Sequence, residues 1–291
     1  MSDLINSVLA QYEKNKNAAS GIGKISQEER MKKYFNTILP KGTRNGEKRV
    51  RILPTKDGSS PFIEVYFHEL QVDGKWVKIY DPAQVGDRSP LNEVREALLE
   101  TGKESDKEIA KSYRSRKFYI VKVVDRDNEQ DGVKFWRFKD SYKNEGILDK
   151  IFPIFKSRGD ITDPKTGRDL TLSLALTKSG NNREYTVINS ILPEDPSPLH
   201  ENAEITSEWV EDTLTWKDAY SMKPVEWLEM VAKGETPKWN NDTKKWVSSS
   251  VEDEEIAGTG SSTADDEDDV DATNVPDDPQ DEDESNDDLP F

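Results

Sequence analysis

The sequence predicts a mainly β fold of the α+β class, a small antiparallel barrel with helical insertions and a disordered acidic C-terminal tail. Short segments alternate apolar and polar residues, as strands with one buried face do. Asp-Gly pairs, which favour tight hairpin turns, separate such segments at Asp73-Gly74 and Asp131-Gly132. In contrast, residues 251–291 hold 18 Asp and Glu and no Lys or Arg, so this stretch cannot build a core.

Seven segments are predicted strands. In the first of them Val50 and Ile52 share one face, and Arg49 and Arg51 share the other. The three predicted hairpins explain why the strands follow one another in pairs. In chain order the strands are 48–53, 62–72, 75–80, 118–124, 133–138, 171–176 and 184–191.

Two helices are predicted between the third and fourth strands. Ser89 and Pro90 provide an N-cap and a first-turn proline, and Gly102 ends the first helix. Ser105 and Glu108 have the spacing of a capping box, which predicts the start of the second helix.

Further helices are expected outside this insertion. Residues 144–155 read as a helix whose inward side chains are Ile147, Leu148, Ile151 and Phe152. A short amphipathic helix is expected within residues 1–25, a helix at 225–233 and a hairpin at 238–246. The predicted organisation is therefore an N-terminal arm (1–30), a core (31–205) with a helical insertion at about 82–113, a C-terminal helix and hairpin packed on the core (206–250), and the tail (251–291).

The net charge of −17 belongs to the tail. The first 250 residues hold 40 acidic and 41 basic residues, so the folded part is close to neutral. The absence of cysteine excludes thiol catalysis and Cys-based metal sites, and two histidines exclude a multi-His metal site. No run of 18 apolar residues and no signal peptide is visible, which predicts a cytosolic protein without a membrane partner.

Basic and aromatic residues interleave between residues 103 and 138. Lys107, Lys111 and Arg114 recur at helical spacing and precede a strand that begins with aromatic residues. Cations neutralise phosphates while rings stack on bases, so this pattern favours single-strand binding without sequence preference and without catalytic residues. The candidate binding residues are Arg49, Arg51, Lys107, Lys111, Arg114, Arg116, Lys117, Phe118, Tyr119, Trp136, Arg137, Lys178, Arg183 and Tyr185.

Other interpretations of these residues stay open. The helix face could be merely solvated and the rings could belong to the core. Asp125, Asp127 and Asp131 could belong to a metal-dependent nuclease, although a polar hairpin turn explains them more simply. The tail could instead serve a protein–protein adaptor or chaperone that has little affinity for DNA.

The last five residues form a candidate docking peptide for partner proteins. Asp287 and Asp288 precede Leu289, Pro290 and Phe291, so an apolar tip follows an acidic stretch. A partner with an apolar pocket and surrounding cations could bind such a tip.

Several motifs occur in an order and spacing that resembles a known family. The motifs are Val50-Arg51-Ile52-Leu53-Pro54, His68 with Asp73-Gly74-Lys75-Trp76, Arg114-Ser115-Arg116-Lys117, Phe135-Trp136-Arg137-Phe138 and Leu148-Asp149-Lys150-Ile151. Together they resemble the helix-destabilising single-stranded DNA-binding protein of T-even-like phages, and the tail tip looks like that of bacterial single-stranded DNA-binding proteins.

The resemblance implies an OB-fold core whose helical subdomain forms a basic, aromatic-lined cleft. It implies self-association along DNA through the arm, and a tail that recruits replication, recombination and repair proteins in the infected bacterial cell. It supports Arg51, Lys111, Arg114, Arg116, Lys117, Phe118, Trp136 and Tyr185 as binding residues.

Two departures from the family pattern affect these expectations. The family prototype binds zinc through one His and three Cys, but here His68 is accompanied by Asp81, Ser89 and Asn92. We therefore expect no zinc and no other cofactor. The basic cooperativity motif of the arm is also missing, because the first 20 residues offer only Lys14 and Lys16.

Overall fold

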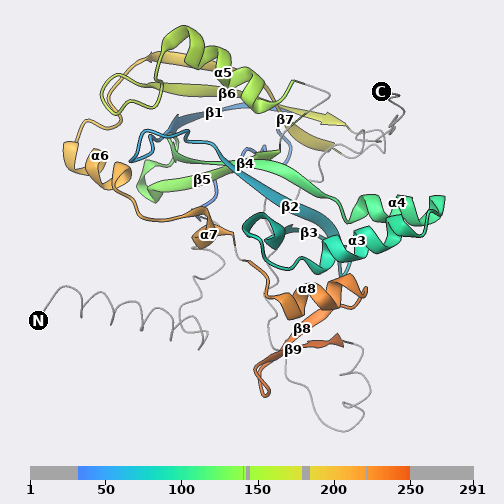
Figure 1. Cartoon of the computed structure of the whole chain (residues 1–291). Coiled ribbons are helices and arrows are strands. Elements are labelled where there is room, and N and C mark those ends of the chain that lie inside the picture. Colours follow the sequence, from blue (N-terminus) through green and yellow to red (C-terminus); the bar gives the residue numbers. More distant parts are fainter. Residues whose placement is uncertain (1–31, 140, 142–144, 179–183, 221, 250–291) are drawn as a thin grey trace, which may run out of the picture.

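A seven-stranded antiparallel sheet forms the centre of the molecule (Figure 1). The structure is a computed structural model that describes residues 32–139, 141, 145–178, 184–220 and 222–249. The strand order is β3-β2-β4-β1-β6-β7, and β5 pairs with β4. The strands are β1 (Asn45–Ile52), β2 (Ile63–Val72), β3 (Lys75–Tyr80), β4 (Ser115–Asp125), β5 (Val133–Lys139), β6 (Arg168–Lys178) and β7 (Glu184–Pro196).

Strand β4 pairs with three other strands. Its first half pairs with β2, from His68 opposite Ser115 to Ile63 opposite Ile120. Its last residues pair with the end of β1, where Arg51 lies opposite Val124. Strand β5 pairs with β4 from Phe118 to Val124. Strand β4 thus joins the β2–β3 hairpin to the β1–β6–β7 part of the sheet.

Alternating side chains divide the interior into separate cores on the two faces of the sheet. Val121 and Val123 of β4 pack with Val50 and Ile52 of β1 in the core beneath α5. Phe118 and Ile120 of β4 point to the other face and pack with residues of β2, β5 and the chain around Trp216. Because both faces of β4 are covered, nearly all its apolar residues are buried, as expected for a strand between two layers.

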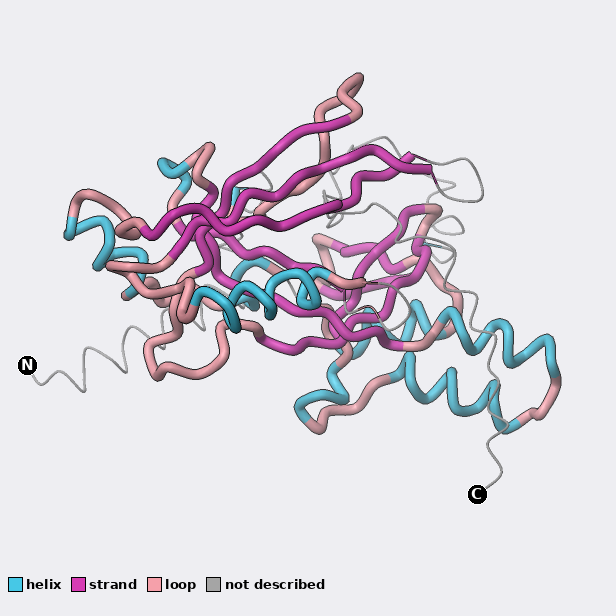
Figure 2. Tube along the Cα trace, turned by 90° about the horizontal axis from the view of Figure 1, so that it is seen from above, coloured by secondary structure: helices cyan, strands magenta, loops and turns pink. Residues whose placement is uncertain are grey.

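The helices cover the sheet faces and extend from one end of it (Figures 1 and 2). Helices α3 and α4 lie side by side beyond the ends of β2 and β4, and α5 lies over β6 and β7. The helical elements are η1 (Pro82–Val85), α3 (Pro90–Glu100), α4 (Glu104–Ser112), η2 (Glu129–Asp131), α5 (Ile147–Arg158), α6 (Ala203–Val210), α7 (Trp216–Ala219) and α8 (Val225–Ala232).

Local sequence signals account for most element ends. Asp73 and Gly74 both adopt positive φ (51° and 73°), which is the geometry of a two-residue hairpin turn. Ser89 is the N-cap of α3, and Gly102 takes a φ of 69° after its end. The predicted capping box was wrong, because α4 begins at Glu104 with Lys103 as its N-cap.

Helix α5 is displaced by three residues from its prediction. It starts after Gly146, whose backbone N–H donates to Asp149 Oδ2 at 2.7 Å. Its inward residues are Leu148, Ile151 and Ile154. The expectation that Phe152 faces inward was wrong, since this side chain is 51% exposed.

Helix α8 and the hairpin of β8 (Pro237–Asn240) and β9 (Lys245–Ser248) follow the sheet, as predicted. Trp227 and Leu228 of α8 pack with Leu91 of α3 and with Ile79 of β3, so α8 holds the helical insertion against the sheet. Trp239 and Trp246 form a cross-strand pair with ring centroids 5.4 Å apart.

The predicted fold class is confirmed as α+β with a mostly antiparallel sheet, and such a sheet is compatible with an OB-like core. The predicted N-terminal helix and acidic tail lie outside the described residues. Among the residues that the structure describes, no helix is long and apolar enough to cross a membrane.

Candidate nucleic-acid interface

Three cations from three strands converge on one carboxylate at the end of the sheet nearest α4. Glu69 of β2 lies 3.6 Å from Lys78 Nζ, 3.5 Å from Arg116 Nε and 3.8 Å from Lys139 Nζ. Glu69 pairs directly with Lys78 in the β2–β3 ladder, and β4 and β5 bring the other two. These four residues, here called the Glu69 cluster, carry a formal charge of +2 and suit an anionic ligand.

Arg137 lies on the same face of the sheet, held among aromatic rings. Its guanidinium carbon is 4.4 Å from the ring centroid of Tyr220, 5.1 Å from that of Phe67 and 5.8 Å from that of Phe118. Burial raises the pKa of Tyr220 to about 12, against the opposing effect of the Arg137 cation, so the phenol is neutral at physiological pH. Cation–π contacts of this kind fix the cation beside the Glu69 cluster.

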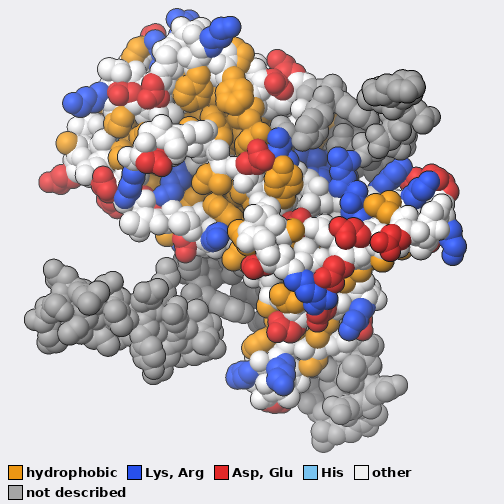
Figure 3. Space-filling view, in the orientation of Figure 1, with side chains coloured by type: hydrophobic (Ala, Val, Ile, Leu, Met, Phe, Trp, Pro, Cys, Tyr) orange, Lys and Arg blue, Asp and Glu red, His pale blue; other side chains and the backbone are white. Residues whose placement is uncertain are grey.

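The opposite face of β4 presents a second cation together with a ring. Lys117 Nζ lies 5.5 Å from the ring centroid of Tyr119 and 3.8 Å from Glu64 Oε2. Tyr119 is half-buried, and its ring lies 6.0 Å from that of Phe138. Figure 3 shows Lys and Arg side chains gathered where β4 meets α4, with hydrophobic side chains between them and α5.

The basic residues of helix α4 lie next to this region, because the end of the helix leads into β4. Lys107 and Lys111 are exposed and form i,i+3 ion pairs with Glu104 and Glu108. Exposed pairs of this type contribute about 0–1 kcal/mol, so both lysines can exchange their partners for phosphates at little cost. Arg114, which is also exposed, lies between α4 and β4. The structure therefore brings Lys107, Lys111, Arg114, Arg116, Lys117, Tyr119 and Arg137 to one end of the sheet.

Phe118 and Trp136 do not belong to this surface. Each has 2% of its area exposed. Phe118 packs against Phe67 in one core, and Trp136 packs against Phe35 and Phe138 in the other. The predictions that these two rings stack on bases were wrong, because core packing leaves no ring face accessible.

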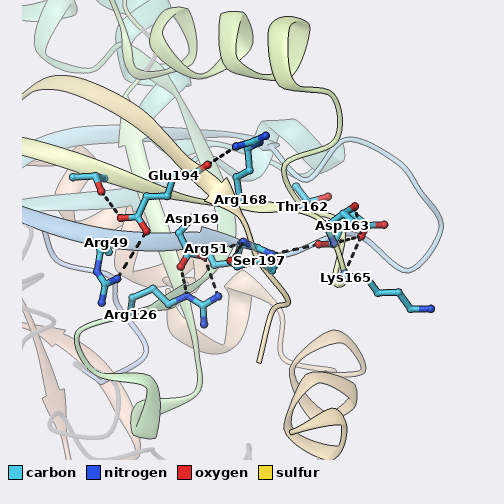
Figure 4. Close-up of polar contacts among 12 residues, drawn as sticks. Arg49, Arg51, Arg126, Thr162, Asp163, Lys165, Arg168, Asp169, Glu194 and Ser197 are labelled. Carbon is cyan, nitrogen blue, oxygen red and sulfur yellow. Dashed lines mark hydrogen bonds and ion pairs between the residues drawn. The ribbon is translucent and has the colours of Figure 1, made fainter. Parts of the chain in front are cut away.

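Arg51 is also a buried structural residue (Figure 4). Its side chain donates to Asp169 Oδ1 at 3.0 Å and to the Ser197 carbonyl oxygen at 2.7 Å. Arg126 donates to both oxygens of the same carboxylate, at 3.0 and 2.9 Å. Burial lowers the pKa of Arg51, and the charge of Asp169 opposes this effect. The prediction that Arg51 contacts DNA was wrong, since its guanidinium is fully enclosed.

The remaining candidates lie toward the β6–β7 side of the sheet. Arg49 is 3.9 Å from Glu194, and Lys178 is 3.7 Å from Glu184; both cations are half exposed. Tyr185 is half-buried on β7, and Arg183 lies outside the described residues. The structure does not join Arg49 to the cations at the start of β4.

Sequence reasoning missed Lys78, Lys139 and Glu69. Lys78 alternates with apolar residues in its strand, and Lys139 directly follows a predicted strand, so each was visible as a polar strand position. Their convergence depends on the register of three pairings, which the sequence does not show.

The acidic hairpin turn has structural partners. Asp125 is buried, lies 3.3 Å from Lys134 Nζ and accepts a hydrogen bond from the backbone N–H of Asp127. Asp131 lies 2.9 Å from the same lysine. Within the described residues no group of three or more His, Asp or Glu could hold a metal ion.

The residues at the positions of the family's zinc ligands form a buried hydrogen-bonded cluster. His68 Nδ1 donates to the Tyr113 carbonyl oxygen at 2.8 Å, and His68 Nε2 lies 3.5 Å from Asp81 Oδ1. Asn92 Nδ2 donates to both oxygens of Asp81, at 3.2 and 3.0 Å. Burial raises the pKa of Asp81, but the hydrogen bonds and charge of His68, together with Asn92, outweigh burial and hold it well below its usual range.

The side chains of this cluster do not fit a zinc ion. Structural zinc sites use four thiolate or imidazole ligands in a tetrahedron. Here a single imidazole is present, and Asn92 directs a hydrogen-bond donor, not a lone pair, at the carboxylate. His68, Asp81, Asn92 and Tyr113 instead connect β2 and the ends of α3 and α4 directly.

Comparison with protein-family models identifies a family. The model of the family described as "gp32 DNA binding protein like" matches residues 44–233, which cover the whole sheet and the helical insertion. A search of curated proteins found no match.

Proposed function

Since this chain belongs to the gp32-like family of DNA-binding proteins, we propose that it coats single-stranded DNA without sequence preference. The observation that carries the proposal is the gathering of cations on both faces of the sheet at the start of β4. Arg116, Lys139 and Lys78 converge on one face, and the Lys117–Tyr119 pair lies on the other. Single-strand binding without sequence preference needs such a cationic path with rings along it.

In this proposal the cations bind phosphates and the protein performs no catalysis. Arg114, Arg116, Lys117 and Lys139 line the path at the junction of α4 with the sheet, and Tyr119 offers a partly exposed ring for a base. Glu69 holds three cations in position before DNA arrives. Preorganised side chains lose less conformational entropy on binding.

Further parts of the proposal rest on the sequence. The 18 carboxylates after Ser250 would compete with DNA for the cations, and the released tip would recruit replication, recombination and repair proteins. The chain would self-associate along DNA and act in the cytoplasm of a phage-infected bacterium. We also propose that it works without zinc, since the cluster around His68 takes the place of the metal.

Titration of a labelled oligo-dT, followed by fluorescence anisotropy at several salt concentrations, tests the DNA-binding proposal. The logarithm of the binding constant should fall linearly with the logarithm of salt concentration, with a slope of about −0.7 per neutralised phosphate. Arg116→Ala should weaken binding and make the slope shallower by about 0.7. Lys165→Ala, which removes an exposed cation from the loop between α5 and β6, is the control and should leave the slope unchanged. Absence of binding at low salt would refute the proposal.

A further inference from the structure

A row of four aromatic rings connects the exposed side of α5 to β4, with Phe138 buried and Phe62 and Tyr119 half-buried. Phe152 of α5 contacts Phe62 edge-to-face, with centroids 5.9 Å apart and planes at 90°. Phe62 contacts Phe138 of β5 at 6.4 Å, and Phe138 contacts Tyr119 of β4 at 6.0 Å. Lys117 lies over the last ring. These rings, Phe152, Phe62, Phe138 and Tyr119, are here called the aromatic row.

The ring of Phe152, at the α5 end of the row, is exposed, because other residues of α5 pack against the core. Helix α5 packs through Leu148, Ile151 and Ile154, which leaves Phe152 51% exposed. Figure 3 shows hydrophobic side chains over α5 that continue toward the Lys and Arg side chains at the start of β4. A contiguous exposed apolar patch of this kind marks a binding surface.

The position of the patch indicates its ligand. At its inner end the row meets the cation of Lys117 at the start of β4. A ligand that follows both features must carry negative charge along its length and apolar faces at intervals. Unpaired nucleotides have this chemistry, because each has a phosphate and a base with two π faces.

We propose that the single strand leaves the cationic path at Lys117 and runs along the aromatic row, with one base stacked on Tyr119 and another on Phe152. This inference rests on the proposed function and extends it to α5, a helix that sequence patterning assigned to the core. It assigns Phe152 as a binding residue and Phe62 as the ring that fixes its orientation.

The test compares three substitutions at Phe152 in the full-length chain by oligo-dT anisotropy. Phe152→Ala should lower affinity about 5- to 150-fold, the loss of one stacked base, with an unchanged salt slope. Phe152→Leu should lose nearly as much, whereas Phe152→Trp should bind like the unchanged chain and show a tryptophan signal that DNA quenches. Leu192→Ala removes a residue of similar exposure (58%) from β7 and should have no effect.

The outcomes separate this inference from the proposed function. If the unchanged chain binds oligo-dT and Phe152→Ala binds equally well, the inference is wrong and the proposed function stands. If the unchanged chain does not bind, both fail. If Phe152→Ala changes only the sedimentation of the free protein, the patch is a contact between copies and the inference is overturned. Urea unfolding of each variant verifies that the fold is retained.

Discussion

The reassignment of Arg51 from DNA contact to structural residue predicts a specific separation of stability from binding. Arg51→Ala removes two short hydrogen bonds, to Asp169 and to the Ser197 carbonyl, from a fully buried site. Hydrogen bonds to charged groups contribute about 1.5–3 kcal/mol each, which gives about 3–6 kcal/mol. Arg126 still pairs with Asp169 in the variant, so no buried carboxylate is left alone, and we expect a loss of about 3–4 kcal/mol.

Two further variants calibrate this value. Asp169→Ala removes the shared acceptor and leaves both guanidinium groups of Arg51 and Arg126 without it, so the expected loss is larger, about 5 kcal/mol. Arg49→Ala removes a neighbouring, half-exposed arginine whose distance to Glu194 is 3.9 Å, and the expected loss is below about 1 kcal/mol.

Equilibrium unfolding in urea measures the three losses, and anisotropy with oligo-dT measures binding under conditions where each variant is folded. We expect Arg51→Ala to bind DNA with the affinity and salt slope of the unchanged chain. The reasoning is refuted if Arg51→Ala unfolds at the same urea concentration as the unchanged chain but binds DNA more weakly and with a shallower salt slope.

Three other predictions concern the cluster around His68 and the tail. The purified chain should contain far less than one zinc per molecule, and EDTA should not change its melting temperature; stoichiometric zinc with an EDTA-sensitive melt would contradict the assignment. Because the folded state lowers the pKa of Asp81, its carboxylate stabilises the fold above the unfolded pKa of about 3.9, and this contribution is lost as the pH falls below about 4. Asp81→Asn should therefore be less stable at pH 7, with a smaller further loss on acidification, in urea titrations across pH 3–7; equal acid sensitivity would count against it. Truncation after Ser250 removes 18 carboxylates and should tighten oligo-dT binding, most at low salt; unchanged affinity at low salt would exclude competition by the tail.

Features that depend on neighbouring residues were predictable from the sequence. The Asp73-Gly74 hairpin formed because both residues tolerate the positive φ that the turn requires. Ser89-Pro90 and Gly102 placed the ends of α3 within a residue. The cations at the α4–β4 junction were found because they lie within eleven residues of one another, Lys107 to Lys117.

Features that depend on distant residues were not predictable. Arg51 occupies the polar position of an alternating strand, which is typical of a surface residue. Its buried partner Asp169 lies 118 residues further along the chain. Phe118 and Trp136 lie on strands covered on both faces, so alternation could not show which rings are exposed. Helix α5 packs on its core through Leu148, Ile151 and Ile154, a face that leaves Phe152 exposed, and helical spacing alone could not show which face the core would cover.

The pairing of β4 with three strands has a consequence for the order in which the chain folds during synthesis. The pairings among β2, β3, β4 and β5 join neighbouring segments that end at Lys139. In contrast, β1 pairs with β4 only at its end and with β6 along most of its length, with Lys48 opposite Leu172, 124 residues later. Contacts close in sequence form faster. We expect the cationic half of the sheet to acquire structure while the apolar face of β1, with Val50 and Ile52, is still uncovered. A nascent chain would then carry an open hydrophobic edge until β6 emerges, which makes this interval the one most exposed to aggregation and most dependent on chaperones.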